Sequence, residues 1–353
     1  MKTMTIAQDK IRLTEFSHGG GCGCKIAPAV LSELLAATPI RGLPKELLVG
    51  TETSDDAAVY KLNDTQALVA TTDFFTPIVD DPYDFGRIAA TNAISDIYAM
   101  GAKPIFALAL VGMPLDKLPL EVIGKILAGG ESVCAEAGIP IAGGHSIDVL
   151  EPIYGLVALG LVDPQKIKRN STAKSGDILI LGKPLGVGIL SAALKKGKLS
   201  DAGYAAMIES TTKLNTPGIA LADMPEVHAL TDVTGFGLAG HLLEICRGSK
   251  LSAEVAFLDL PFLSDAISFV KNGIATGASE RNWKGYGQDV AMPSGSPEWQ
   301  QKLVTDPQTS GGLLVACAPS AEQAVLAEFA RRGFAQAKTI GRLSAGPARV
   351  IFS

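Results

Sequence analysis

The sequence contains no apolar run long enough to cross a membrane, and no charged-then-apolar signal segment opens it. Its longest apolar stretches, Pro104–Val111 and Ile153–Val162, are much shorter than the roughly 20 residues that a membrane helix needs. We expect both stretches to be buried strands. The sequence therefore predicts a protein without a membrane partner and with a cytoplasmic location.

Dense basic patches are also lacking. The 31 Lys and Arg residues are outnumbered by 36 Asp and Glu residues, which gives a net charge of −5, and aromatic residues make up only 6% of the chain. This balance argues against nucleic acid as the main partner. The 353 residues, 47% of them hydrophobic, are too many for one ordinary core, so we expect two domains.

Cysteine is scarce, and its arrangement excludes a disulfide framework. Of the five cysteines, Cys134, Cys246 and Cys317 are single residues in apolar surroundings and are expected to be core residues. Cys22 and Cys24 differ, because they lie with Lys25 in the glycine-rich stretch Ser17–Lys25. In a reducing compartment these two thiols are expected to be free and functional, or to be ligands.

Several chemistries could use this stretch. A phosphate-binding P-loop is excluded, because Lys25 is followed by Ile26 instead of Ser or Thr. A zinc site would have only two close ligands, and a redox pair would need a strained ring. A nucleophilic or carrier thiol remains, whose pKa a nearby ammonium would lower. The alternative is a flexible linker with incidental cysteines.

The order of predicted elements favours an α+β fold in two domains of mixed and antiparallel sheet with helices, because strands and helices follow no regular βαβ order. The polar segment Asp163–Gly176 is the predicted boundary. The predicted strands are Ala57–Tyr60, Ala67–Thr72, Pro104–Gly112, Ile139–Ala142, Ile153–Val162, Asp177–Leu181, Val227–Val233, Ala253–Leu258 and Leu313–Cys317. The predicted helices are Pro28–Ala37, Pro82–Met100, Pro119–Ala137, Leu238–Arg247, Phe262–Asn272 and Ala321–Arg332, with further helical patterns within Ile189–Met224.

Aspartates beside small residues at strand ends form a second candidate site. Asp56 precedes a predicted strand, Asp232 ends another, and Asp96 shares a helix face with Asn92, one turn earlier. Such hard oxygen ligands suit Mg²⁺. Asp residues also cap helices and turns, and for these three the spacing leaves both readings open. For Asp80, Asp81 and Asp84, at the start of a long helix, we expect capping.

Three glycine clusters could direct backbone amides at phosphate groups. Each cluster alone is weak evidence for phosphate binding, because tight turns use the same residues. Three such clusters beside the aspartates favour a nucleotide site. His228 and His241 are expected to be structural. The clusters are Gly143–Ser146, Thr234–Gly237 and Thr309–Gly312.

Together these motifs resemble the selenophosphate synthetase (selenide, water dikinase) family, along nearly the whole chain. The wider superfamily, which includes aminoimidazole ribonucleotide synthetase, shares the fold and the aspartates, whereas the Cys-Gly-Cys-Lys loop distinguishes the selenium branch. The matching stretches are Leu13–Thr14 with His18–Lys25, Glu52–Tyr60, Thr71–Phe75, Phe85–Met100, Ala142–Asp148, Leu230–His241 and Asp306–Leu314.

The resemblance implies an enzyme that converts hydrogen selenide, ATP and water to selenophosphate, AMP and orthophosphate, the activated selenium that selenocysteine and selenouridine synthesis use. It implies Cys22 and Lys25 as catalytic residues. It implies Mg²⁺ bound by Asp56, Asp96 and Asp232. The implied ATP contacts are Lys25, Thr53, Ser54, Asp55, Asp73, Asp96, Gly144, His145 and Ser146.

The resemblance also implies a homodimer in which the N-terminal sheets of two subunits form a barrel, and a selenium-delivery protein is a further candidate partner. The expected division is a catalytic loop and arm in 1–50, an ATP- and Mg²⁺-binding dimerisation domain in 51–162 and an α+β domain in 163–353. Two alternatives remain: another ATP enzyme of this fold, acting on a purine precursor or a thiamine phosphate, and a non-enzymatic thiol carrier.

Overall fold

The structure is a computed structural model that describes residues 11–17, 19–26, 30, 34, 42–50 and 54–353. Thr53 and His18 lie outside the described residues. The predicted helix Pro28–Ala37 also lies outside them, except for Val30 and Leu34, which are helical. Among the described residues, no helix combines the length and the apolar character needed to cross a membrane.

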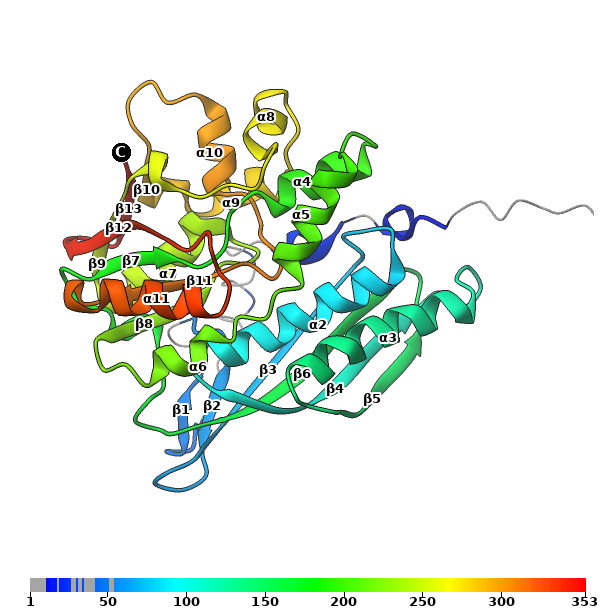
Figure 1. Ribbon diagram of the computed structural model, residues 1–353, viewed down its shortest axis with the longest axis horizontal. Coiled ribbons are helices and arrows are strands. Elements are labelled where there is room, and N and C mark those ends of the chain that lie inside the picture. The colour runs from blue at the N-terminus through cyan, green and yellow to red at the C-terminus, as the bar shows by residue number, and fades with distance from the viewer. Residues whose placement is uncertain (1–10, 18, 27–29, 31–33, 35–41, 51–53) are drawn as a thin grey trace, which may run out of the picture.

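The N-terminal half forms a six-stranded sheet with strand order β1-β2-β3-β6-β4-β5. Its strands are β1 (Leu47–Val49), β2 (Ala58–Lys61), β3 (Ala67–Phe75), β4 (Lys103–Met113), β5 (Ile141–Asp148) and β6 (Ile153–Val162). Neighbouring strands are antiparallel, except that β4 and β5 are parallel. Two helices, α2 (Pro82–Ala99) and α3 (Leu120–Glu136), cover one face of this sheet (Figure 1).

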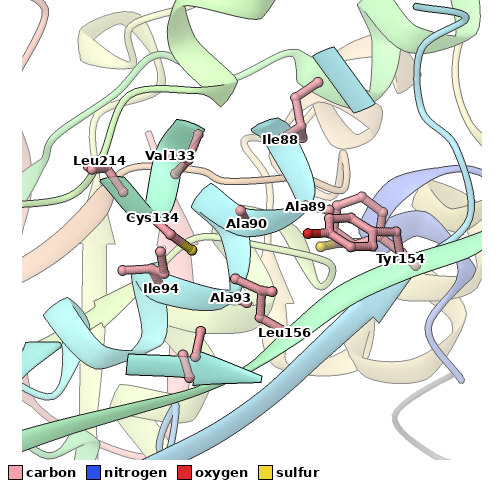
Figure 2. Packing of buried hydrophobic residues seen from close by; sticks show 14 of the residues in the cluster. Ile88, Ala89, Ala90, Ala93, Ile94, Val133, Cys134, Tyr154, Leu156 and Leu214 are labelled. Atoms are coloured by element: carbon pink, nitrogen blue, oxygen red, sulfur yellow. The ribbon is translucent and has the colours of Figure 1, made fainter. Parts of the chain in front are cut away.

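Helices α2 and α3 contact each other through their backbones at two glycines. A Cβ atom on Gly86 would lie 1.9 Å from the carbonyl oxygen of Ile126, and one on Gly129 would lie 2.0 Å from the carbonyl oxygen of Tyr83. Small and branched side chains fill the space around this contact, including Ala89 of α2 and Val133 of α3 (Figure 2). The face of α2 that carries Asn92 and Asp96 is therefore held in a fixed position.

The C-terminal half forms a mixed seven-stranded sheet with strand order β10-β13-β9-β12-β7-β11-β8. Its strands are β7 (Ile178–Leu181), β8 (Val227–Asp232), β9 (Leu251–Val255), β10 (Val290–Ala291), β11 (Leu313–Cys317), β12 (Lys338–Ala345) and β13 (Arg349–Phe352). Its helices are α4 (Val187–Lys195), α5 (Asp201–Thr211), α6 (Pro217–Ala222), α7 (Gly237–Ser249), α8 (Ala266–Lys271), α9 (Gly277–Tyr286), α10 (Glu298–Val304) and α11 (Glu322–Arg331). The predicted α+β architecture with mixed and antiparallel sheets is confirmed.

The two halves meet along α2. A Cβ atom on Gly218 of α6 would lie 2.1 Å from the carbonyl oxygen of Tyr98, so the start of α6 lies directly against the end of α2. Asn215 donates hydrogen bonds to Ser95 Oγ (2.7 Å) and to the Gly311 carbonyl (2.8 Å). Helix α2 therefore belongs to the first sheet by its packing and presents polar side chains to the second.

One predicted strand was wrong in its extent. The predicted short strand Ile139–Ala142 leads into the glycine cluster Gly143–Ser146, whereas β5 includes this cluster and continues through Asp148. The reason is close pairing with β4, because a Cβ atom on Gly144 would lie 2.1 Å from the Ala109 carbonyl oxygen. These glycines therefore allow two strands to approach each other.

Other differences concern the C-terminal half. The predicted helix Phe262–Asn272 begins only at Ala266, and helices α9 and α10 were not predicted. Helix α9 combines Gly277, Ser279 and Asn282 with few large apolar residues, so its sequence has a weak helical pattern.

Replacing Gly86 by Ala should destabilise the protein by about 1–3 kcal/mol or more, because the new methyl group overlaps backbone atoms of α3 that have no rotamer freedom. Gly124→Ala is the matched control: Gly124 is in the same helix pair, but nothing lies within 4 Å of its Cβ position. That substitution should be neutral or stabilising by up to about 1 kcal/mol. Thermal unfolding measures both, and equal Tm values for the two variants would contradict the backbone contact.

Candidate functional site

Three carboxylates from distant segments converge between the two sheets. Asp56 precedes β2, Asp96 lies on α2 and Asp232 ends β8, and one oxygen of each lies within 4.8 Å of the others. We call these three residues the carboxylate cluster. One residue comes from a loop before a strand, one from a helix face and one from a strand end, and the fold brings these three positions together although they lie far apart in the sequence.

Hydroxyl groups hold each member of the carboxylate cluster in place. Thr231 Oγ donates to Asp56 Oδ1 (2.8 Å), Thr71 Oγ donates to Asp96 Oδ2 (2.5 Å), and Ser95 Oγ donates to Asp232 Oδ2. Each hydroxyl satisfies one carboxylate oxygen without neutralising its charge. The side chains are therefore positioned, while their repulsion remains.

The electrostatics of the carboxylate cluster call for cations. Burial raises the pKa of Asp56 and of Asp96 well above the ordinary value, and the charges of the neighbouring carboxylates raise it further. Burial likewise raises the pKa of Asp232. Asp56 Oδ2 is buried without a hydrogen-bond partner. A set of hard oxygen donors with an unsatisfied carboxylate oxygen fits a divalent cation such as Mg²⁺.

Lys25 reaches this region from the glycine-rich loop. Its Nζ lies 3.6 Å from Oδ2 of Asp73, a residue of β3 near the carboxylate cluster. Burial alone would lower the pKa of Lys25, but the charges of Asp73 and Asp96 outweigh it, so the pKa lies above its usual value. Lys25 is therefore charged at neutral pH and is a cation that an anionic ligand can share.

Cys22 is held inside the structure by an amide network. Its backbone N donates to Thr309 Oγ (3.1 Å), and its Sγ donates to Asn92 Oδ1 (3.3 Å). Asn92 Oδ1 also accepts from the Ser310 backbone N (2.7 Å), and Asn92 Nδ2 donates to Asp73. Asn92 on α2 therefore links the Cys22 thiol, the loop Asp306–Gly312 and Asp73, which is the ion-pair partner of Lys25.

The protonation state of the Cys22 thiol differs from the one that the sequence predicts. We expected the Lys25 ammonium to lower its pKa, but burial raises the pKa of Cys22 well above its ordinary value and outweighs Lys25. Cys22 is only 1% exposed. In this arrangement Cys22 is a neutral thiol that donates a hydrogen bond. Cys24 is half-buried, and its Sγ donates to the Gly21 carbonyl (2.9 Å).

The chain before the loop is anchored at Asp80. The backbone N and Oγ of Thr14 both donate to Asp80 Oδ1, at 3.1 and 2.6 Å, and Arg12 Nε donates to Asp80 Oδ2 (3.1 Å). Asp81 caps α2 by accepting from the Asp84 backbone N (2.9 Å), as predicted.

A pocket of about 560 Å³ opens beside the carboxylate cluster. Lys25, Ser54, Asp55, Asp56 and Asp96 line it, and Asp55 is oriented because its Oδ1 accepts from the Asn170 backbone N (2.6 Å). Most of the predicted nucleotide contacts of the first 100 residues are therefore brought together at one opening.

Gly144, His145 and Ser146 are not brought to this pocket in a single chain. They lie on the exposed edge strand β5 and line a separate pocket of about 420 Å³, with Leu127 and Tyr154 among its other residues. Asp73 does not line the first pocket, but it contacts one of its residues through the ion pair with Lys25.

Sequence reasoning missed several residues that support the site. Asn92 was noted only for its position one turn before Asp96, yet it is the centre of the amide network. His241, expected to be structural, lines the larger pocket, with Nδ1 2.9 Å from Glu244 and its ring stacked on Phe236. The helical spacing of Asn92, Ser95 and Asp96 was a usable signal, because polar residues on an otherwise apolar helix need partners.

Known proteins share both the fold and the sequence. The family models "AIR synthase related protein, N-terminal domain" and "AIR synthase related protein, C-terminal domain" match residues 54–162 and 174–352. A crystal structure of thiamine-monophosphate kinase from Stenotrophomonas maltophilia aligns with a TM-score of 0.63, covering 92% of this chain and 96% of that chain. At 20% identity, that likeness shows the fold alone.

Similarity to curated proteins is much higher. A selenide, water dikinase from Burkholderia ambifaria is 66% identical over 339 residues, which are 96% of each chain. Another from Pseudomonas straminea is 65% identical over 343 residues, covering 96% of this chain and 95% of the relative. This chain belongs to the AIR synthase related family and, within it, to the selenide, water dikinases.

Proposed function

We propose that this protein synthesises selenophosphate from selenide, ATP and water, releasing AMP and orthophosphate. The relatives that match along nearly the whole chain have the name selenide, water dikinase. The observation that supports the proposal best is the position of Lys25. Its side chain lines the pocket beside the carboxylate cluster and also lines the small cavity beside Cys22. One cation therefore borders both a metal-binding region and a thiol.

The carboxylate cluster would hold Mg²⁺ through Asp56, Asp96 and Asp232. Bound there, Mg²⁺ would neutralise phosphate oxygens that the carboxylates would otherwise repel. The chain's own contribution is positioning and charge: Lys25 supplies a fixed positive charge, and Thr71, Ser95 and Thr231 orient the carboxylates. Ser54 and Asp55 would contact ATP at the same opening, and we extend this role to Thr53.

Cys22 is the residue that we assign to selenium. Its thiol is buried beside Lys25 and is held by Asn92, which excludes bulk water from its surroundings. A soft, easily oxidised nucleophile benefits from such exclusion, because water competes for the same phosphoryl group. The loop Ser17–Lys25 must open to admit substrates, so we propose that it acts as a lid.

Gly144, His145 and Ser146 would act in a homodimer. Strand β5 is an exposed sheet edge, and Ile147 and Leu150 beside it are exposed apolar side chains. An unpaired edge of this kind can pair with a second copy of the chain. We propose that the N-terminal sheets of two subunits combine there, within the division 1–50, 51–162 and 163–353, and that the enzyme works in the cytoplasm.

Replacing Cys22 by Ser should lower selenophosphate formation at least about 100-fold, because a hydroxyl keeps the hydrogen bond to Asn92 but is a far weaker nucleophile. The measurement is phosphorus NMR of an anaerobic reaction with ATP, Mg²⁺ and selenide. Wild-type enzyme should yield selenophosphate and AMP, and ADP as sole nucleotide product would argue against the proposed function. Cys24→Ser is the matched control and should lose less activity. Full selenide-dependent AMP production by Cys22→Ser would refute the role of Cys22.

Replacing Asp56 by Asn should have opposite effects with and without metal. Without metal the variant should be more stable than wild type, because one of three repelling buried charges is gone. With Mg²⁺ and a non-hydrolysable ATP analogue, its affinity should fall at least about tenfold. Thermal unfolding and calorimetry measure the two effects. Asp64→Asn, in an exposed turn, is the control. Unchanged metal-dependent nucleotide affinity would contradict the assignment of Asp56.

A further inference from the structure

A small cavity lies beside Cys22. It has a volume of about 10 Å³ and is lined by Cys22, Lys25, Phe236, Ala278, Arg281 and Asn282, among others. That volume is room for about one water-sized group. A nucleotide cannot enter such a space, whereas a ligand with a single heavy atom can.

Helix α9 forms the wall of this cavity opposite the loop. Arg281 Nη2 donates to the carbonyl oxygen of Gly23 (2.8 Å), the peptide between the two cysteines. Asn282 Nδ2 donates to the carbonyl oxygens of Gly235 (2.9 Å) and Thr305 (3.0 Å). Neighbouring residues of one helix therefore fasten two sides of the cavity, the glycine-rich loop and the turn before α7.

Helix α9 is itself firmly held. The Thr276 side chain caps it by accepting from the Ser279 backbone N (3.2 Å). Ser279 Oγ lies 2.6 Å from Thr305 Oγ and donates to the Lys302 carbonyl (3.0 Å). Arg281 therefore projects from a rigid element, and its hydrogen bond to Gly23 fixes the loop relative to the C-terminal half.

The charges around the cavity favour a small anion. Lys25 and Arg281 are cations on two of its sides, and the described residues that line it include no carboxylate. Hydrogen selenide is present at neutral pH mainly as the hydroselenide monoanion, which has one heavy atom. That atom is large and polarisable, and suits the sulfur and aromatic surfaces of Cys22 and Phe236.

We propose that the cavity is the hydroselenide subsite and that Arg281 is a positioning and specificity residue, which fastens the closed loop through Gly23 and supplies the second cation beside the anion. This inference rests on the proposed function, since it takes selenide as the substrate. It concerns Arg281 and α9, which lie outside the stretches that carry the family resemblance.

The first test is steady-state kinetics of Arg281→Gln and Arg281→Lys. Gln can still donate a hydrogen bond but has no charge, whereas Lys keeps the charge. Arg281→Gln should raise KM for selenide about tenfold, a change of about 1.4 kcal/mol, and should leave KM for ATP unchanged. Lys should restore part of the selenide affinity. Arg342→Gln, an exposed arginine of β12 paired with Glu254, is the control.

The second test is the alkylation rate of Cys22 by iodoacetamide in a Cys24→Ser background, with selenide absent. Because Cys22 is buried, it reacts only when the loop opens, and Arg281→Ala should increase the rate at least about fivefold. This readout does not depend on turnover, so it separates failure of the inference from failure of the proposed function.

Three outcomes would overturn the inference. One is an unchanged selenide KM in Arg281→Gln, even if alkylation of Cys22 accelerates in Arg281→Ala. Another is an equal rise in the KM values for ATP and selenide, which would indicate general disturbance of the site. The third is an unchanged alkylation rate. In each case continued selenophosphate production by the wild type would leave the proposed function standing.

Discussion

Repulsion among three buried carboxylates is the constraint on which the site depends. Asp56, Asp96 and Asp232 come from a loop, a helix and a strand of two different halves, and one oxygen of each lies within 4.8 Å of the others. Hydroxyl groups orient these carboxylates but leave their charges in place. The arrangement is therefore a frame that is most stable when cations occupy it, and cation binding would also join the two halves.

Hydrogen bonds connect the loop with Cys22 to this frame. Thr309, Asn92 and Arg281 each contact the loop by one polar interaction. Individual hydrogen bonds contribute about 0.5–1.5 kcal/mol to stability. A loop held by a few of them can be ordered in the closed state and still release within a catalytic cycle, which a loop buried by large apolar side chains could not do as readily.

Much of the fold could be predicted from the sequence, because local patterns determine it. Helix α2 could be predicted from the capping residue Asp81 and from the helical spacing of its apolar residues. Aspartates at the ends of predicted elements indicated the carboxylate cluster. Strand β5 was cut short, because paired glycines signal both turns and close strand pairing. Only the pairing partner, here Ala109 of β4, distinguishes the two.

The chemistry of the loop was harder to predict. A lysine three residues after Cys22 implied a lowered thiol pKa, but burial has the larger effect and acts in the opposite direction. Burial depends on segments more than 200 residues away, such as the loop with Thr309. No sequence pattern points to Arg281. Its hydrogen-bond acceptor is the backbone carbonyl of Gly23, and every residue in a chain has a backbone carbonyl.

The anchor at Asp80 sets a limit on how far the thiol can travel. Cys22 follows Thr14 by eight residues, and an extended chain spans at most about 3.6 Å per residue, so the tether is shorter than about 29 Å. However widely the loop opens, Cys22 stays within that radius of the start of α2. Any macromolecule that delivered selenium to this thiol would therefore have to present its cargo inside this sphere, which would limit its docking to surfaces around one end of the N-terminal half.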